Sequence, residues 1–144
     1  MNQPPARANQ PAAAAAEPLY TLRGPVVHGL GNGRKVRMPT ANLVPPAGGT
    51  LPPFGVYAAI VRVGPEAYIG VTNVGLRPTL EGEQTPTVET LILGFSGDLY
   101  GREITISLYC FLRPTRRMAS LDEVHAQVEK DGLRAQRLLS PLLG

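Results

Sequence analysis

Several residues and patterns that define common functional classes are scarce in this chain. Of its 144 residues only Cys110 is a cysteine, so no intramolecular disulfide can form and we expect a reducing, cytoplasmic location. With only His28 and His125 and no Cys/His cluster, a zinc site is not expected. No apolar run approaches the roughly 20 residues needed to span a bilayer. The N-terminus also lacks a leucine-rich signal core, so we expect neither membrane insertion nor export.

Familiar catalytic and nucleic-acid-binding motifs are also missing. There is no GxxxxGK[ST] phosphate loop and no GxSxG nucleophile elbow. The formal net charge of +3 is typical of an ordinary soluble surface, and no long Lys/Arg run or aromatic RNA-binding signature accompanies it. We therefore expect no nucleic-acid partner, while a basic nucleic-acid-binding barrel remains an alternative.

The composition predicts one domain rich in strands and turns. Hydrophobic residues make up 43% of the chain, and 16 glycines and 15 prolines accompany abundant valine, leucine and isoleucine. Residues 1–17 combine proline, glutamine and an alanine run with nothing to bury, so we expect a disordered tail there. The folded domain is expected to cover residues 18–144.

Short apolar runs separated by turn residues predict a small antiparallel barrel. The expected strands are Tyr20 to Val27, Gly55 to Val63, Ala67 to Val71, Thr87 to Leu93 and Ile104 to Leu112. Cys110 alternates with apolar residues in the last of these and is expected to be a buried hydrophobe. Two segments rich in Gly, Pro and Thr, Gly29 to Pro53 and Thr72 to Pro86, are expected to be long loops. Loops of this length in a compact domain often bind ligands.

The C-terminal segment changes to helical periodicity, and an amphipathic helix is expected at about residues 120–139. Its apolar face consists of Leu121, Val124, Val128, Ala135, Leu138 and Leu139. Ser120 followed by Glu123 is a capping-box pattern. Gly132 weakens the middle of the helix, so a break near Asp131 is possible.

Three motifs are candidates for ligand binding or catalysis, and the first is the glycine-rich segment from Gly29 to Lys35. Alternate glycines let the backbone approach a ligand closely, and Arg34 and Lys35 supply positive charge, so a phosphate would fit. A glycine-rich surface turn has the same appearance.

The second motif is Met38 to Asn42. Pro39 disfavours helical geometry at Met38, so the segment is expected to be extended, with Thr40 and Asn42 on one side. Two neutral oxygen ligands can suffice for Mg²⁺ when ATP supplies the negative charge. The alternative is an Asx or Ser/Thr turn.

The third motif is Val88 to Leu93, in which Glu89 is a lone carboxylate in an apolar strand. In alternating register it shares a face with Leu91 and Leu93, which disfavours the charged form unless donors or cations compensate. A strand-end glutamate pointing to solvent is the alternative.

These motifs belong to an ordered series along the chain. It runs through Gly24 to Gly29, Gly33-Arg34, Pro39 to Asn42, Gly55 to Ala58, Gly70 to Gly75, Arg77 to Thr79, Val88-Glu89, Phe95, Asp98 to Gly101, Leu112-Arg113, Ser120-Leu121 and Gln127 to Asp131. The series resembles the riboflavin kinase domain, the flavokinase module that bacteria usually carry as the C-terminal half of a bifunctional FAD synthetase. The resemblance covers nearly everything from Leu22 to Leu139.

The resemblance implies a fold and a set of site residues. The fold is a small six-stranded Greek-key antiparallel barrel with a C-terminal helix. Thr40 and Asn42 are expected to help hold Mg²⁺ and nucleotide phosphates, and Glu89 is expected to be the catalytic base. The isoalloxazine ring is expected between the barrel mouth and the region entering the helix. The implied nucleotide-binding residues are Gly29, Gly31, Gly33, Arg34, Pro39, Thr40, Asn42, Asn73, Arg77 and Thr79.

The implied activity is transfer of the γ-phosphoryl group from Mg-ATP to the terminal ribityl hydroxyl of riboflavin, giving FMN and ADP. Mg²⁺ or another divalent cation is the expected cofactor, and riboflavin and ATP are the expected partners. The nucleotidyltransferase half of the bifunctional enzymes, with its histidine-bearing phosphate motif, is not found in this sequence, so FAD synthesis is not expected. The sequence contains no signal for oligomeric state.

Three positions depart from the family pattern: Arg37 replaces a common glycine, Leu91 a frequent polar residue, and Gly94 a frequent aspartate. None of them removes a proposed ligand or the base, although Arg37 places a side chain in the phosphate loop. A non-catalytic flavin-sensing or regulatory module with the same fold is therefore the alternative function.

Overall fold

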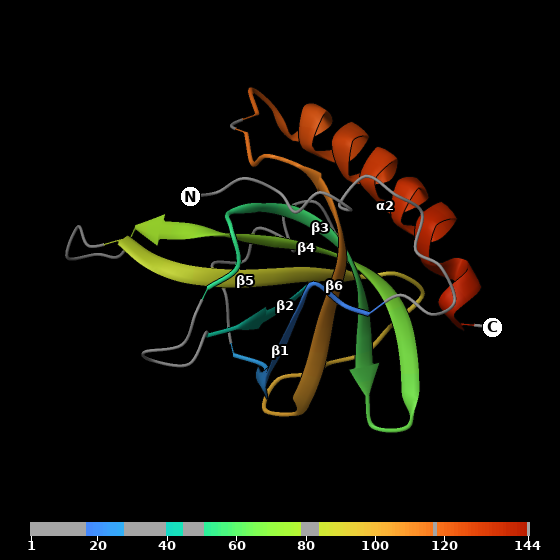
Figure 1. Ribbon diagram of the computed structural model, residues 1–144. Coiled ribbons are helices and arrows are strands. Elements are labelled where there is room, and N and C mark those ends of the chain that lie inside the picture. Colours follow the sequence, from blue (N-terminus) through green and yellow to red (C-terminus); the bar gives the residue numbers. More distant parts are fainter. Residues whose placement is uncertain (1–16, 28–39, 45–50, 79–83, 117, 144) are drawn as a thin grey trace.

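The computed structural model describes residues 17–27, 40–44, 51–78, 84–116 and 118–143. In this part of the chain six strands precede one long helix, α2 (Figure 1). Their bounds are β1 Tyr20–Pro25, β2 Thr40–Leu43, β3 Gly55–Val63, β4 Glu66–Pro78, β5 Gln84–Ile92, β6 Glu103–Arg113 and α2 Leu121–Leu143.

The observed strands agree with most of the predicted ones and correct two predicted loops. β3 begins and ends at the predicted residues. The loop predicted at Thr72 to Pro86 is wrong over most of its length, because residues 72–78 continue β4 and residues 84–86 begin β5. The loop predicted at Gly29 to Pro53 contains β2. β2 is extended over Thr40 to Asn42, as the sequence predicts for the residues after Pro39.

The strands form one antiparallel sheet in the order β1-β6-β3-β4-β5-β2. Three consecutive strands, β3 to β5, pair in sequence, and β6 returns to lie beside β3, which is the Greek-key arrangement. The sheet curls until its two edges meet, where the backbone N–H of Val27 donates to the carbonyl of Asn42 at 2.8 Å. The predicted six-stranded Greek-key fold is confirmed. The sheet is a curled half-barrel, and this one bridge joins its two edge strands.

Alternation along the strands produces two apolar layers. Inward-facing side chains, such as Tyr57, Val88 and Ile106, fill the barrel interior. Outward-facing side chains of β3, β4 and β6 pack instead against Ala135 and Leu139 of α2, which lies across the outside of the sheet (Figure 1). Because both of its faces are covered, β3 is a nearly continuous buried run.

Polar groups in the barrel interior are paired. The hydroxyl oxygens of Thr72 and Thr90, both fully buried, lie 2.7 Å apart on neighbouring strands. The Tyr57 hydroxyl donates to the Pro53 carbonyl at 2.6 Å, and burial, with a smaller contribution from Tyr20, raises the pKa of Tyr57 to about 12. Among the described residues no buried side-chain polar atom lacks a partner, which is typical of a well-formed core.

Two irregularities in the pairing of β6 with β3 enlarge the layer under α2. The register shifts between Val56 and Tyr57 and again between Ala58 and Ala59. At the second shift, Tyr109 and Cys110 both join the layer under the helix although they are adjacent in sequence. Cys110 is buried there, as predicted, and burial raises the pKa of its thiol.

The helix begins as the capping pattern predicts. The Ser120 hydroxyl accepts from the Glu123 backbone N–H at 3.2 Å, and the Glu123 carboxylate accepts from the Ala119 N–H at 2.9 Å. No break occurs near Asp131, because α2 continues to Leu143. A Cβ added at Gly132 would lie 3.6 Å from the side chain of Leu93, which directly follows β5, so this glycine sits where the helix packs closely on the end of that strand. Within the described residues no helix is apolar enough over a sufficient length to cross a bilayer.

Replacing Ser120 by alanine should lower the free energy of unfolding by about 0.5 to 2 kcal/mol, because the Glu123 N–H loses its acceptor. Urea denaturation followed by circular dichroism measures the change. Ser96→Ala, at an exposed position between β5 and β6, is the matched control. Equal stability of the two variants would contradict the assigned helix start.

Candidate functional site

Three polar side chains lie side by side on neighbouring strands. Asn42 of β2 pairs with Glu89 of β5, and Glu89 pairs on its other side with Asn73 of β4. Directly paired residues of antiparallel strands point to the same face, with Cβ atoms about 4.5 to 5.5 Å apart. Asn42, Glu89 and Asn73 therefore form a cross-strand row, called the polar row below.

The polar row faces the outside of the barrel, the same side on which α2 packs. Its orientation follows from strand alternation, because the neighbours Val88 and Thr90 point into the interior while Leu91 packs in the layer under the helix. The three side chains of the row are half-buried. Glu89 therefore lies within β5, flanked on both sides by paired strands, and is not a strand-end residue.

Thr40 lies on the same face, next to the row. It pairs with Leu91, two residues along each strand from the Asn42–Glu89 pair, and its burial alternates with that of Ala41 and Leu43. The side-chain oxygens of Thr40 and Asn42 thus belong to neighbouring positions of one face. Such neutral hard oxygens fit Mg²⁺ when substrate phosphates and water complete its coordination. The described residues contain no group of three or more His, Cys, Asp or Glu side chains that could hold a metal by themselves.

The other sequence-predicted ligand residues are only partly covered by the structure. Arg77 belongs to β4 and pairs with Thr85 of β5, further along the strands from Asn73 and Glu89. The remaining predicted residues lie outside the described part of the chain; they are Gly29, Gly31, Gly33, Arg34, Pro39 and Thr79.

Two of the three departures from the family pattern have a structural explanation. Leu91 packs in the apolar layer under α2, where a large aliphatic side chain is favourable. Gly94 adopts a φ of 79°, a left-handed conformation that glycine takes without steric cost. Arg37 lies outside the described residues.

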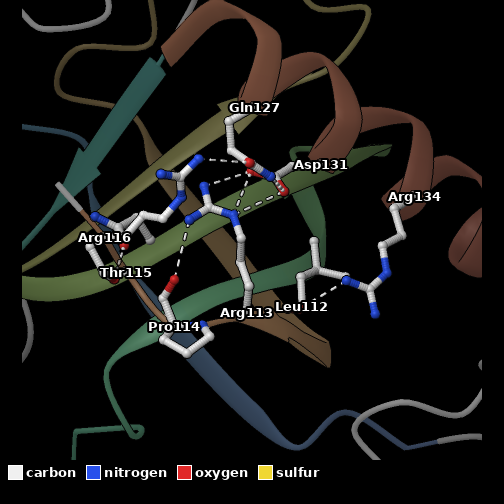
Figure 2. Close-up of polar contacts among 9 residues, drawn as sticks. Leu112, Arg113, Pro114, Thr115, Arg116, Gln127, Asp131 and Arg134 are labelled. Carbon is white, nitrogen blue, oxygen red and sulfur yellow. Dashed lines mark hydrogen bonds and ion pairs between the residues drawn. The ribbon is translucent and has the colours of Figure 1, made fainter. Parts of the chain in front are cut away.

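A second polar cluster extends the line of the row toward the helix. Asn73 pairs with Val56 of β3, and Val56 pairs with Arg113 of β6. The Arg113 guanidinium donates to both carboxylate oxygens of Asp131 on α2, with Nη2 to Oδ2 at 2.8 Å and Nε to Oδ1 at 3.1 Å (Figure 2). Gln127 donates to the same carboxylate at 3.0 Å.

We call this second cluster, which consists of Arg113, Gln127 and Asp131, the anchor cluster. The sequence analysis assigned these residues no function and named them only as part of the series that carries the resemblance. The sequence did contain one indication of a buried ion pair, because Asp131 falls on the apolar face of the helix beside Ala135. Its side chain is 5% exposed and that of Arg113 is 21% exposed, so the pair is largely removed from water. Several hydrogen bonds to one carboxylate offset the cost of burying its charge.

The comparisons with known proteins agree with the resemblance in the sequence. The family model described as "Flavokinase: Riboflavin kinase" matches residues 16–139. The "Bifunctional riboflavin kinase/FMN adenylyltransferase" of Escherichia coli K12 is 41% identical over 118 residues, which cover 81% of this chain and 37% of that protein. The protein of the same name from Listeria monocytogenes is 37% identical over 112 residues, covering 78% of this chain and 36% of the relative.

A solved structure supports the same fold. The crystal structure of riboflavin kinase from Trypanosoma brucei matches with a TM-score of 0.59 and 26% identity, over 85% of this chain and 82% of that one. This chain spans little more than a third of the two bifunctional relatives.

The anchor cluster generates a stability prediction. Asp131→Ala leaves the Arg113 guanidinium largely buried without its carboxylate, and should cost about 3 to 5 kcal/mol of unfolding free energy. The control is Glu103→Gln, which removes the exposed ion pair with Arg23 and should change stability by less than about 1 kcal/mol. Chemical denaturation of both variants measures the difference. Similar losses in the two variants would show that the anchor cluster adds nothing beyond a surface pair.

Proposed function

Since this chain belongs to the riboflavin kinase family, we propose that it transfers the γ-phosphoryl group of Mg-ATP to the terminal ribityl hydroxyl of riboflavin. The products are FMN and ADP. The observation that carries the proposal is the polar row, in which a carboxylate lies between two carboxamides on one face of the sheet, next to the hydroxyl of Thr40.

Each part of the row has a role in the proposed reaction. The ribityl hydroxyl oxygen attacks the γ-phosphorus while the bond from that phosphorus to the bridging oxygen breaks, and ADP leaves with the electron pair. Glu89 accepts the hydroxyl proton as the new bond forms. Asn42 and Asn73, on either side of Glu89, orient the groups that meet there.

Thr40 and Asn42 are the proposed protein ligands of Mg²⁺, because their oxygens share one face beside the base. When bound, Mg²⁺ offsets negative charge on the transferring phosphoryl group. The glycine-rich segment Gly29 to Arg34, with Pro39, Arg77 and Thr79, stays a prediction for phosphate binding. The cytoplasmic location likewise stays a prediction, motivated by the single cysteine.

The direct test is to incubate the purified chain with riboflavin and Mg-ATP and to look for FMN by chromatography. A Glu89→Gln preparation purified in the same way controls for contaminating kinase. FMN formation above that control is the expected result. Tight binding of flavin without any turnover would support the flavin-sensing alternative, and binding to nucleic acid with a steep salt dependence would support the nucleic-acid alternative.

The metal site predicts the behaviour of two substitutions. Thr40→Val and Asn42→Leu each remove an oxygen from the proposed Mg²⁺ site, so each should weaken Mg-ATP binding while the barrel still folds. Nucleotide titrations with and without Mg²⁺ measure the effect, and Thr21→Val on the exposed side of β1 is the control. An unaltered metal dependence in both variants would rule out the assigned ligands.

The proposed base predicts a loss of turnover without a loss of binding. Glu89→Gln keeps the shape of the side chain but removes its basicity, so kcat should fall by about 10² to 10⁴. Riboflavin and nucleotide affinities should change much less. Single-turnover phosphorylation and separate ligand titrations distinguish the two effects, with Glu103→Gln at an exposed position of β6 as the control. Turnover within about threefold of wild type would exclude Glu89 as the base.

A further inference from the structure

The segment between β6 and α2 makes a hydrogen bond to the polar row. The hydroxyl of Thr115 donates to Oδ1 of Asn73 at 2.8 Å, across 42 positions of sequence. Thr115 is exposed and Asn73 is half-buried, so the bond lies at the surface where the row ends. No sequence motif had pointed to Thr115.

This bond engages the oxygen of the Asn73 carboxamide. A carboxamide has an accepting oxygen on one side and a donating NH₂ group on the other. Thr115 follows β6, which lies beyond β3, whereas Glu89 lies on β5, at the opposite flank of β4. With Oδ1 engaged by Thr115, the NH₂ group is the part of the Asn73 carboxamide left available for Glu89, its paired neighbour on β5.

The orientation matters because the neighbour is a carboxylate. An NH₂ group beside Glu89 can donate to the carboxylate and so orient it relative to a substrate hydroxyl. In the flipped orientation a carbonyl oxygen would face the carboxylate, and two acceptors cannot form a hydrogen bond with each other.

Thr115 is itself held in place by the anchor cluster. Arg113 binds Asp131 of α2 through Nε and Nη2, and its Nη1 donates to the Pro114 carbonyl at 3.2 Å (Figure 2). The residue directly before Thr115 is therefore fastened by the same guanidinium that joins β6 to the helix. Arg116, directly after it, donates to Gln127 of α2 at 3.5 Å.

We propose that Thr115 is a positioning residue for phosphoryl transfer, which acts through Asn73 by holding its carboxamide with the NH₂ group toward Glu89. This inference rests on the proposed kinase function. In the proposed reaction Thr115 touches neither Glu89 nor the reacting atoms. The anchor cluster supports it by fixing the segment from which its hydroxyl reaches the sheet.

Two substitutions separate the hydroxyl from the rest of the side chain. Thr115→Val keeps the shape and removes the donor, whereas Thr115→Ser keeps the donor. We expect Thr115→Val to lower kcat about threefold to tenfold, the range that loss of one hydrogen bond supports. The KM values for riboflavin and ATP should stay within about twofold of wild type, and Thr115→Ser should restore kcat. Thr21→Val on β1 is the control for a threonine hydroxyl lost elsewhere on the surface.

A spectroscopic measurement tests the geometry without relying on turnover. The side-chain amide signals of Asn73 in a nitrogen-15 correlation spectrum are assigned by their absence in Asn73→Ser. Thr115→Val should shift them and Thr115→Ser should not. Unshifted signals in Thr115→Val, or an equal loss of kcat in the valine and serine variants, would overturn the inference. If wild type makes no FMN, the proposed function fails, and the amide signals still decide whether Thr115 orients Asn73.

Discussion

The pairing register of β5 with its two neighbours is the constraint on which the candidate site depends. β5 lies between β2 and β4, and its alternate residues Val88, Thr90 and Ile92 are buried in the barrel interior. A slip of one residue would exchange the two faces of the strand and place the Glu89 carboxylate among the interior side chains, at a large cost in free energy. The apolar core therefore keeps Glu89 on the outer face, opposite Asn42 and Asn73.

The outer face has two parts because α2 covers only one of them. Over β3 and its neighbours the helix buries Ala135 and Leu139 against the sheet. On the other part of the outer face, β2, β5 and β4 carry the polar row. The buried pair of Arg113 and Asp131 joins these parts, since it ties the end of β6 to the helix and fixes the segment that reaches Asn73. Stability and site geometry thus depend on some of the same contacts.

Local patterns predicted the elements whose own side chains determine them. The continuous apolar run of β3 and the Ser120–Glu123 cap are readable because their signals lie within a few residues. Glu89 was recognisable as an exception within an apolar strand. The second half of β4 could not be predicted as a strand, because its Gly, Pro and Thr residues are typical of loops. It forms a strand only by pairing with β5.

Contacts between segments that are distant in sequence could not be predicted from local sequence patterns either. The bulges of β6 depend on how it pairs with β3, and nothing in the residues 109–113 alone places neighbouring side chains on one face. The bond from Thr115 to Asn73 joins residues 42 positions apart and needs the tertiary fold. Asp131 on the apolar helix face did give a signal, but its partner Arg113 could be assigned only from the structure.

The proposed reaction requires the metal–nucleotide complex to bind at the polar row and Thr40. Titration of the nitrogen-15-labelled chain with Mn²⁺ and ADP tests this directly, because the paramagnetic ion broadens the signals of nearby amides. Binding there should give the strongest broadening at Thr40 to Leu43 and around Glu89, and little at Thr21 or Ser107 on the β1–β6 side of the sheet. Broadening centred on β1 and β6, with the amides of β2 and β5 unaffected, would contradict it.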